Sequence, residues 1–346
     1  MKRVYSLDLF KLYFAYVIAL GHFGINIPGA SFAVKLFFVI SGFFLARKFY
    51  TKSYIPEGLF TPQQRYSHKQ YTIDHIKHLF PHYIFSYAVM LIYTLVLFIP
   101  AAIKDKGLIS TAYLTVRTVY NTVPELMFVQ SSGFFESCLN YPVWQINAII
   151  ICGYFIYACL YYCEKLSADL LFPVIFILFE TYWIIGRDPF TNIGCLPATL
   201  TRGVAMMALG VLIYKFSCSE LYKTIKSKHI PYNLFSLFMF AGMFVFGRYN
   251  GIHIIGMCVS VLYLYNPDSW INCIFNKDIF KFCGDLSYAV YLNHAVVIKI
   301  VQQIFGSQNP GNTACIILLL SLTIYSVFTV KIVNILKAYF TRKKSA

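Results

Sequence analysis

The stretch LFKLYFAYVIALGHFGI, residues 9–25, is an apolar run that carries two ionisable side chains, Lys11 and His22. Their separation is three helical turns plus about 20°, so both side chains lie on one face of a helix. A rise of 1.5 Å per residue places them roughly 16 Å apart along the axis. Ionisable groups inside a membrane helix are costly and typical of functional sites. We therefore expect a membrane helix with a site along this face.

The rest of the chain has the composition of a membrane protein. Of its 346 residues, 58% are hydrophobic and 12% are charged, whereas a soluble domain has about 25% charged residues. Backbone amides in a bilayer must bond internally, which favours helices. We predict an all-α, polytopic integral membrane helical bundle of about ten transmembrane helices, with one domain over residues 1–346. The predicted spans are residues 9–25, 32–46, 83–102, 143–163, 170–185, 204–216, 234–246, 252–265, 286–304 and 315–333.

The charge distribution predicts the orientation in the membrane. The net charge is +15 and the pI is about 9.3. Basic residues gather in alternate connections, which the positive-inside rule assigns to the cytoplasm. They are Lys2, Arg3, Arg47, Lys48, Lys52, Arg65, Lys69, Lys77, Lys215, Lys223, Lys226, Lys228, Lys277, Lys281, Lys337, Arg342, Lys343 and Lys344. We expect both termini in the cytoplasm and residues 104–141 outside. The sequence offers no basic face with base-reading or stacking groups, so we expect no nucleic-acid partner.

The cysteines, the first apolar run and one apolar stretch in a connection can each be interpreted in structural terms. The ten cysteines form no CxxC pair, so we read them as small packing residues and expect neither a disulfide framework nor a metal site. Residues 9–25 do not resemble a cleaved signal peptide, because no A-x-A-like cleavage site follows them. We therefore expect them to be retained as a membrane helix. The apolar stretch 113–128 fits either an amphipathic segment on the membrane surface or the lining of a substrate cleft.

The first helix contains a stripe at spacings of three and four, formed by Asp8, Lys11, Ala15, Ile18 and His22. Asp8 and Lys11 could pair simply as neighbours. His22 could make a structural hydrogen bond to another helix. The functional alternative is that the stripe handles a molecule that enters the membrane from one side.

The second helix contains FFVISGFFL, residues 37–45, in which Ser41 and Gly42 are small residues among large ones. Small residues permit close approach of two helix backbones, so we interpret both as packing residues. Because no GxSxG elbow surrounds Ser41, we do not expect it to be a nucleophile.

Two segments near predicted helix ends carry polar candidates. Lys77 and His78 precede a span on the same side as Lys11, where they could be positive-inside anchors or a phosphate-binding cluster. Trp144 and Asn147 lie near the opposite surface. Trp144 is typical of an interfacial anchor, and Gln145 and Asn147 add two amides beside it.

The penultimate helix contains Ser287, Tyr291 and His294 one turn apart on one face, with Tyr288 beside them. Tyr and His side chains at such spacing often form a purely structural hydrogen-bond network. The same arrangement would also suit a site, so both interpretations stay open.

Together these segments resemble acyltransferase family 3, a group of integral membrane proteins that includes bacterial polysaccharide O-acetyltransferases. Residues 6–11 with His22 are similar to the family's opening motif of an Arg, ten residues and a His. Residues 37–45 resemble FFxxSGFL, residues 78–81 resemble RxxP, residues 144–146 resemble WxL, and residues 287–294 resemble SYxxYLxH. Arg202 and Gly210 fit an Arg and a Gly in a later helix. The order and separation of the motifs cover most of the chain.

Four positions depart from the family pattern. Lys11 replaces an Arg, and Lys77 with His78 replaces an Arg pair, so bidentate phosphate recognition becomes point-charge binding. Ile149 stands where many members carry Glu, so a mechanism that needs that carboxylate does not transfer to this chain.

The resemblance implies a membrane O-acyltransferase that moves an acyl group, in our reading acetyl, from cytoplasmic acyl-CoA to a hydroxyl of a cell-surface glycan or its lipid-linked precursor. His22 is the implied general base, since histidine titrates near neutrality, and Asp8 is the second catalytic candidate. Lys11, Lys77 and His78 are the implied donor-binding residues. Candidates for oxyanion stabilisation or acceptor binding are Asn147, Trp144, Arg202, Ser287, Tyr288, Tyr291 and His294.

The implied setting is the bacterial cytoplasmic membrane, with acetyl-CoA as a co-substrate, no bound cofactor and no metal. Membrane lipids are the expected surroundings, and assembly into a homo-oligomer is left open. The main alternative is a transporter or flippase of a lipid-linked sugar, which would also use intramembrane charge. The chain has no detectable internal duplication, which many transporters show. A polysaccharide polymerase, or an acyltransferase of the unrelated membrane family, is disfavoured by residues 37–45 and 287–294.

Overall fold

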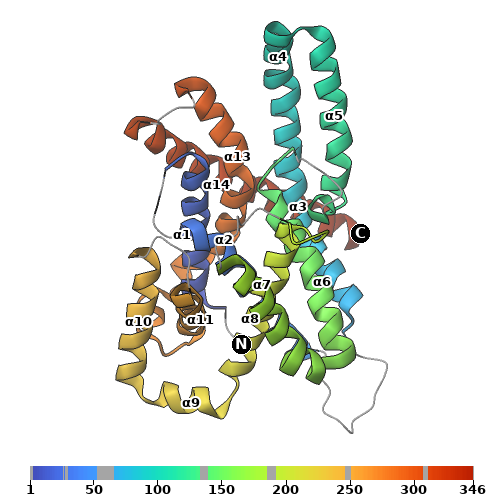
Figure 1. Cartoon of the computed structure of the whole chain (residues 1–346). Coiled ribbons are helices and arrows are strands. Elements are labelled where there is room, and N and C mark those ends of the chain that lie inside the picture. Colours follow the sequence, from blue (N-terminus) through green and yellow to red (C-terminus); the bar gives the residue numbers. More distant parts are fainter. Residues whose placement is uncertain are drawn as a thin grey trace. The chain divides into compact units, whose positions relative to one another are not determined.

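The computed structural model describes residues 3–25, 27, 30–52, 66–132, 139–184, 192–245, 251–306 and 311–345, and most of these lie in α-helices (Figure 1). Short π-helical and 3-10 segments join or interrupt some of them. The elements are α1 Tyr5–His22, α2 Ala30–Lys52, α3 His68–Tyr93, η1 Thr94–Phe98, α4 Ile99–Lys106, α5 Leu108–Leu126, η2 Gln130–Ser132, α6 Val143–Leu166, η3 Ser167–Leu171, α7 Phe172–Ile184, α8 Ala198–Ser217, α9 Glu220–Ser227, α10 His229–Val245, α11 Gly251–Tyr265, α12 Trp270–Phe275, η4 Asp278–Phe280, α13 Lys281–Phe305 and α14 Asn312–Ser345.

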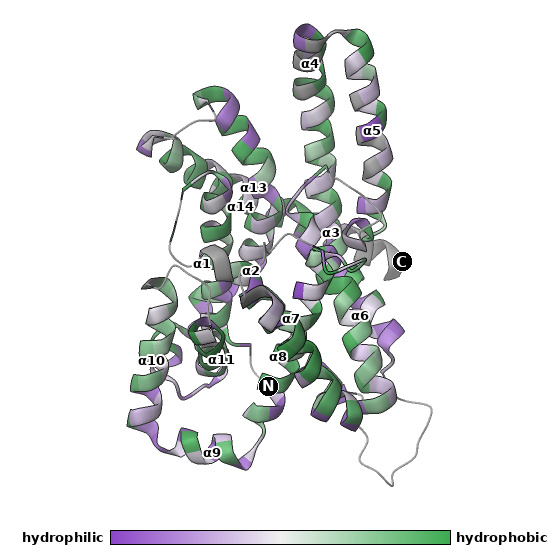
Figure 2. Cartoon of the chain, in the orientation of Figure 1, coloured by the Kyte–Doolittle hydropathy of each residue, from purple (hydrophilic) through white to green (hydrophobic). Residues whose placement is uncertain are grey.

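The long apolar helices confirm the prediction of an all-α, polytopic membrane bundle. By length and composition, four described stretches can cross a membrane: His68–Leu97, Val143–Tyr182, Ala198–Ser217 and Asn312–Tyr339. Gly251–Tyr265 is a shorter apolar helix. Over the described residues, each of the ten predicted spans overlaps a helix or a continuous run of helices. In Figure 2 hydrophobic residues dominate α7 and α8, whereas hydrophilic residues are mixed into α9.

Helix α5 is the main element that the sequence did not predict as regular structure. It occupies Leu108–Leu126, within the connection expected on the outer side. Its side chains at Ile109, Tyr113, Val116 and Tyr120 are exposed. Their spacing of three and four residues forms an apolar stripe, which agrees with the amphipathic alternative for residues 113–128.

The described chain forms two compact units that alternate along the sequence. Unit 1 contains Met1–Leu7, Pro28–Ile76 and Ala148–Asp278, and unit 2 contains Asp8–Ile27, Lys77–Asn147 and Ile279–Ala346. The expectation of one domain over the whole chain stays a prediction.

In unit 1 the backbones of α2 and α8 touch at two glycines. A β-carbon at Gly42 would collide with the carbonyl oxygen of Met207, and one at Gly210 would collide with the carbonyl oxygen of Val39. The neighbouring Ser41 hydroxyl donates to the Phe37 carbonyl oxygen at 2.8 Å, within its own helix. Ser41 and Gly42 therefore lie where α2 meets α8, and Ser41 is engaged with backbone.

A buried ion pair joins α2 to α7 in unit 1. The Lys35 Nζ lies 2.9 and 3.2 Å from the two carboxylate oxygens of Glu180. Both side chains are almost completely buried. The positive charge of Arg202, near the start of α8, acts on Lys35 electrostatically. Removing one partner of such a pair leaves an uncompensated buried charge, so α2 and α7 depend on one another.

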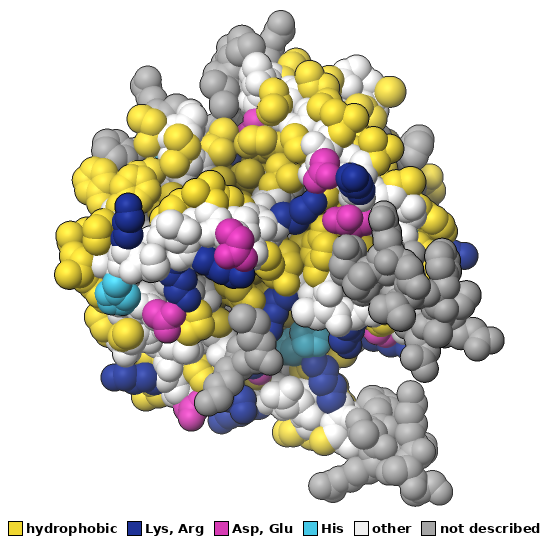
Figure 3. Space-filling model, turned by 90° about the horizontal axis from the view of Figure 1, so that it is seen from below, with side chains coloured by type: hydrophobic (Ala, Val, Ile, Leu, Met, Phe, Trp, Pro, Cys, Tyr) yellow, Lys and Arg dark blue, Asp and Glu magenta, His cyan; other side chains and the backbone are white. Residues whose placement is uncertain are grey.

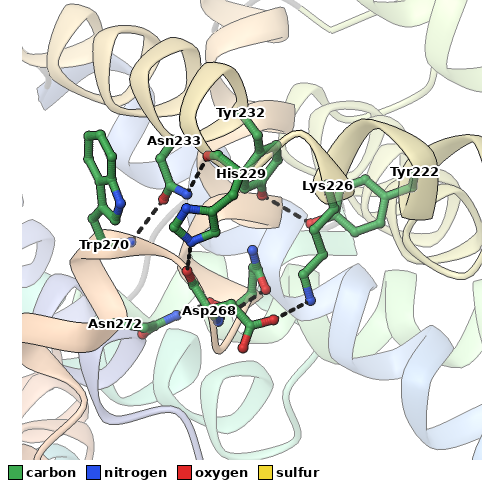
Figure 4. A network of polar contacts seen from close by, with 9 residues as sticks. Tyr222, Lys226, His229, Tyr232, Asn233, Asp268, Trp270 and Asn272 are labelled. Atoms are coloured by element: carbon green, nitrogen blue, oxygen red, sulfur yellow. Dashed lines mark hydrogen bonds and ion pairs between the residues drawn. The ribbon is translucent and has the colours of Figure 1, made fainter.

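A polar network joins α9 and α10 to the turn between α11 and α12 (Figure 4). Lys226 pairs with Asp268 at 2.7 Å, and the His229 ring nitrogen lies 3.2 Å from the Asp268 carbonyl oxygen. The hydroxyls of Tyr222 and Tyr232 lie 3.0 Å apart. Figure 3 shows basic side chains beside acidic ones on the face seen from below. Within the network, the charge of Lys226 is therefore paired with Asp268.

In unit 2, side-chain contacts connect α1, α3, α13 and α14. Tyr16 of α1 and Thr323 of α14 are joined through their hydroxyls at 2.6 Å. Asn293 of α13 donates to the Thr329 hydroxyl at 2.9 Å. Ser86 of α3 donates to the carbonyl oxygen of Leu292 at 2.9 Å. These contacts set α1 and α13 in the register that brings their histidines together.

Candidate functional site

Two histidines from distant parts of the chain stack on each other in unit 2. His22 is the last residue of α1 and His294 lies within α13. Their ring centroids are 5.3 Å apart and the rings are within 14° of parallel. His294 has no exposed surface, whereas His22 is exposed. The sequence predicted both residues as candidates, and the structure adds that they are in contact.

Tyr141 completes this cluster, and it was not among the predicted site residues. Its ring meets His22 edge-on at 5.0 Å and His294 edge-on at 5.7 Å. The available signal was its position three residues before Trp144, in a segment that carries several polar candidates. We call His22, Tyr141 and His294 the histidine cluster.

The orientation of His294 comes from its own helix. Its Nδ1 lies 2.7 Å from the carbonyl oxygen of Tyr291. A carbonyl oxygen only accepts, so this bond assigns the proton of neutral His294 to Nδ1. Among the described residues, Nε2 has no hydrogen-bond partner. The Tyr291 hydroxyl donates to the carbonyl oxygen of Pro142 at 2.6 Å, which ties α13 to the segment that carries Tyr141.

The segment of residues 139–142 is held from both sides. The Asn140 side chain donates to the Ser86 hydroxyl and to the Leu292 carbonyl oxygen, both at 3.1 Å. The backbone N–H groups of Leu139 and Asn140 donate to the carboxylate of Glu125, with a shortest distance of 2.7 Å. Burial raises the pKa of the Glu125 carboxyl to about 7, although the backbone bonds oppose the shift. Glu125 was not among the predicted site residues, because its contacts are with residues 14 and 15 positions further along the chain, which no local pattern reveals.

The polar start of α6 follows directly after this segment. The Ser131 hydroxyl donates to the Trp144 carbonyl oxygen at 2.7 Å. Asn147 is fully buried, and neither its Nδ2 nor its Oδ1 has a hydrogen-bond partner among the described residues. The Gln145 side chain is also buried. Buried amide groups of this kind can be satisfied by water or a polar ligand, so Asn147 remains a candidate for binding a substrate hydroxyl or an oxyanion.

The predicted donor-binding residues lie toward the starts of their helices. Lys11 pairs with Asp8 at 3.8 Å within the first turns of α1. Asp8 is buried and Lys11 is half-buried. Lys77 and His78 are exposed on α3. Along a continuous helix, Asp8 and His22 are roughly 21 Å apart, so Asp8 is placed to orient Lys11 and does not contact His22.

The other candidates divide between the two units. In unit 2 the Ser287 hydroxyl donates to the Gly284 carbonyl oxygen within α13, and the Tyr288 hydroxyl donates to the Leu79 carbonyl oxygen of α3. Arg202 belongs to unit 1, near Lys35. Of the predicted acceptor or oxyanion candidates, His294 therefore belongs to the histidine cluster and Tyr291 contacts it.

The chain matches one family model over most of its length. That model, described as an acyltransferase domain, covers residues 4–332. The match extends over most of both compact units and includes every candidate site residue. No curated protein and no solved structure gives a significant match.

Proposed function

The chain belongs to acyltransferase family 3, and from this premise we propose that it moves an acetyl group from cytoplasmic acetyl-CoA to a hydroxyl of a cell-surface glycan or its lipid-linked precursor. The observation that carries the proposal is the histidine cluster. His22 is exposed at the end of an apolar helix, and its ring is held by His294 and Tyr141. A base must be both accessible and fixed in orientation, and His22 meets both requirements.

The reaction needs one proton acceptor and one group that stabilises developing negative charge. The acceptor hydroxyl attacks the thioester carbonyl carbon, and His22 takes the hydroxyl proton as the new C–O bond forms. The C–S bond then breaks, and the proton passes from His22 to the leaving CoA thiolate. The buried amide of Asn147 is a candidate donor to the oxyanion. Tyr291 donates to Pro142 and so supports the cluster through the backbone.

In this proposal the cytoplasmic end of α1 binds the donor. Lys11, oriented by Asp8, would act with Lys77 and His78 on the CoA phosphates. The pantetheine arm would then extend along α1 over the roughly 16 Å that separates Lys11 from His22. Lysine offers phosphate a point charge and no planar fork, so donor binding should depend strongly on salt.

Replacing Lys77 tests the donor end. Lys77→Ala is expected to weaken acetyl-CoA binding several-fold and to reduce its salt dependence, because one screened charge contact is lost. Binding of labelled acetyl-CoA to purified protein at low and high salt measures both effects. Lys223→Ala, which changes an exposed lysine paired with Glu220 on α9, is the matched control. Equal affinities for the Lys77 variant and wild type would leave Lys77 as a topological anchor.

The decisive experiment for the reaction follows the acetyl group. Membranes with and without the protein receive acetyl-CoA labelled in the acetyl carbon, and both free CoA thiol and labelled glycan or lipid are measured. Protein-dependent thiol release with label in a glycan fraction supports the proposal. Absence of thioester consumption, with movement of a lipid-linked sugar across the membrane, would support a transporter.

The transporter alternative has one supporting observation. The buried pair of Lys35 and Glu180 places two ionisable groups inside apolar helices, and such groups often mark substrate pathways. A transporter has no need of an exposed histidine held by a second histidine, so the acyltransferase proposal accounts for more of the structure.

A further inference from the structure

We propose that Glu125 is a positioning residue for the histidine cluster, and that its carboxylate holds the segment of residues 139–142 so that Tyr141 stays against His22 and His294. This inference rests on the proposed function, in which His22 is the base. It adds a residue on α5, a helix that carries none of the family's motifs.

Glu125 is itself held firmly. It has no exposed surface. The Tyr83 hydroxyl of α3 donates to its backbone carbonyl oxygen. Three residues later Phe128 adopts a φ of 59°, in the left-handed region, and packs on Tyr83 with ring centroids 4.4 Å apart. A phenylalanine rarely adopts this backbone conformation, so the surrounding contacts must enforce the chain reversal after α5.

The carboxylate reaches from this anchor to the backbone that precedes Tyr141. One oxygen accepts the Leu139 N–H at 2.7 Å, and both oxygens lie 3.3 to 3.4 Å from the Asn140 nitrogen. A backbone donor cannot rotate away as a side chain can. These bonds therefore fix the path of the chain immediately before Tyr141.

On the far side of Tyr141 the path is fixed again by α13. The carbonyl oxygen of Pro142 accepts from the Tyr291 hydroxyl, and the Tyr291 carbonyl oxygen accepts from His294. Tyr141 therefore lies between two anchored neighbours. Of these anchors, Glu125 is the charged one, and charge-assisted hydrogen bonds are roughly twice as strong as neutral ones.

A buried carboxylate at position 125 lowers the stability of the fold, which indicates that it is kept for a functional reason. Burial raises the pKa of Glu125 to about 7, so near neutral pH the protein maintains a charge that its interior disfavours. The charge of Lys299 on α13 opposes this rise, and Tyr83 faces Glu125 from α3. A glutamine would avoid the charge but could accept only through one oxygen. Residues that cost stability are often retained because a site needs them.

The test compares Glu125→Gln with wild type and with Glu220→Gln, the same chemical change at an exposed position on α9. All variants are full-length and in native membranes. We expect Glu125→Gln to lower kcat by about tenfold to a hundredfold, the cost of a small misplacement at a site, and to leave the KM for acetyl-CoA within about twofold. Glu125→Asp keeps the charge and should recover part of the loss.

Two measurements distinguish positioning from a merely structural role. Glu125→Gln should melt no lower than wild type at pH 8, and its His22 should react several-fold faster with diethyl pyrocarbonate because Tyr141 no longer covers the ring. Unchanged kcat and unchanged His22 reactivity would overturn the inference, and so would a lower melting temperature that accounts for the lost activity. If wild type consumes no thioester, the proposed function fails, and His22 reactivity still decides the positioning role.

Discussion

At His22 the side chain is exposed, while the ring on which it stacks has no exposed surface. Only an accessible ring can take a proton from a substrate, whereas a buried ring can orient its neighbour. In the proposed reaction this contact gives different roles to two histidines that the sequence could only name as candidates. There His294 would orient its neighbour, and His22 would meet the substrate.

His22→Gln is the sharpest single-residue test of this assignment. Glutamine keeps a hydrogen-bonding amide but cannot take a proton at neutral pH, so transfer should fall by about 10²- to 10⁴-fold, as for a lost general base. Protein level and acetyl-CoA binding should remain, because Lys11 lies at the other end of α1. Transfer and binding are measured on the same membranes, with His229→Gln on α10 as the control. Near wild-type transfer by the Gln variant would move the search for the base to His294.

Glu125 gives a prediction about pH and stability. Its pKa is raised from 4.5 to about 7 in the folded chain, so folding favours the protonated form. The stabilising contribution is therefore complete below about pH 4.5 and disappears as the pH rises through 7, with a total of at most about 3 kcal/mol. Wild type should lose thermal stability relative to Glu125→Gln between pH 5 and 8. Melting curves in detergent across this range measure the difference, and parallel curves would contradict the raised pKa.

Among the elements, α2 and α8 have the closest contact, because Gly42 and Gly210 let their backbones touch. At both glycines an added β-carbon would meet backbone atoms of the other helix, which leaves no room for it. Because Lys35 lies on the same helix and pairs with Glu180 of α7, a shift of α2 would also disturb a buried ion pair. The small residues within the segment 37–45 thus allow α2 to pack on α8, and the position of α2 in turn maintains its ion pair with α7.

Gly42→Ala tests this packing. The added methyl group would meet the Met207 carbonyl group, which cannot move without moving α8, so the cost should exceed the usual 1–3 kcal/mol or so of overpacking. Gly251→Ala is the matched control, since a β-carbon there meets nothing within 4 Å. We expect a clearly lower melting temperature for the Gly42 variant only. Equal melting temperatures would mean that α2 and α8 can separate at little cost.

At the level of the whole molecule, orientation in the membrane is the main open prediction. The distribution of basic residues places both termini in the cytoplasm and residues 104–141 outside. In a cysteine-free background, an impermeant reagent on intact cells should label Leu108→Cys and spare Lys343→Cys. Leu108 is suitable because its side chain is exposed at the start of α5. Labelling of the tail alone would reverse the orientation and place the donor end of α1 outside.

Hydropathy and spacing were sufficient to predict the helices, the membrane class and the shared face of Lys11 and His22. Each of these depends on residues close in sequence, because helix geometry relates neighbours at three and four positions directly. The apolar runs therefore matched helices from α1 to α14. Helix α5 was not among the predicted spans because its run contains Arg117, Pro124 and Glu125, and an amphipathic segment was only one of two interpretations of residues 113–128.

The histidine cluster was decided only by tertiary structure. His22, Tyr141 and His294 lie far apart in the chain, and no local periodicity relates them. Their contact depends on how α1 and α13 pack and on hydrogen bonds from Glu125, Asn140 and Tyr291 that hold the intervening segment. Sequence determines which side chains each helix can offer, because that follows from local backbone geometry. Which of them meet is set by long-range packing, whose energy is shared among many residues and belongs to no single motif.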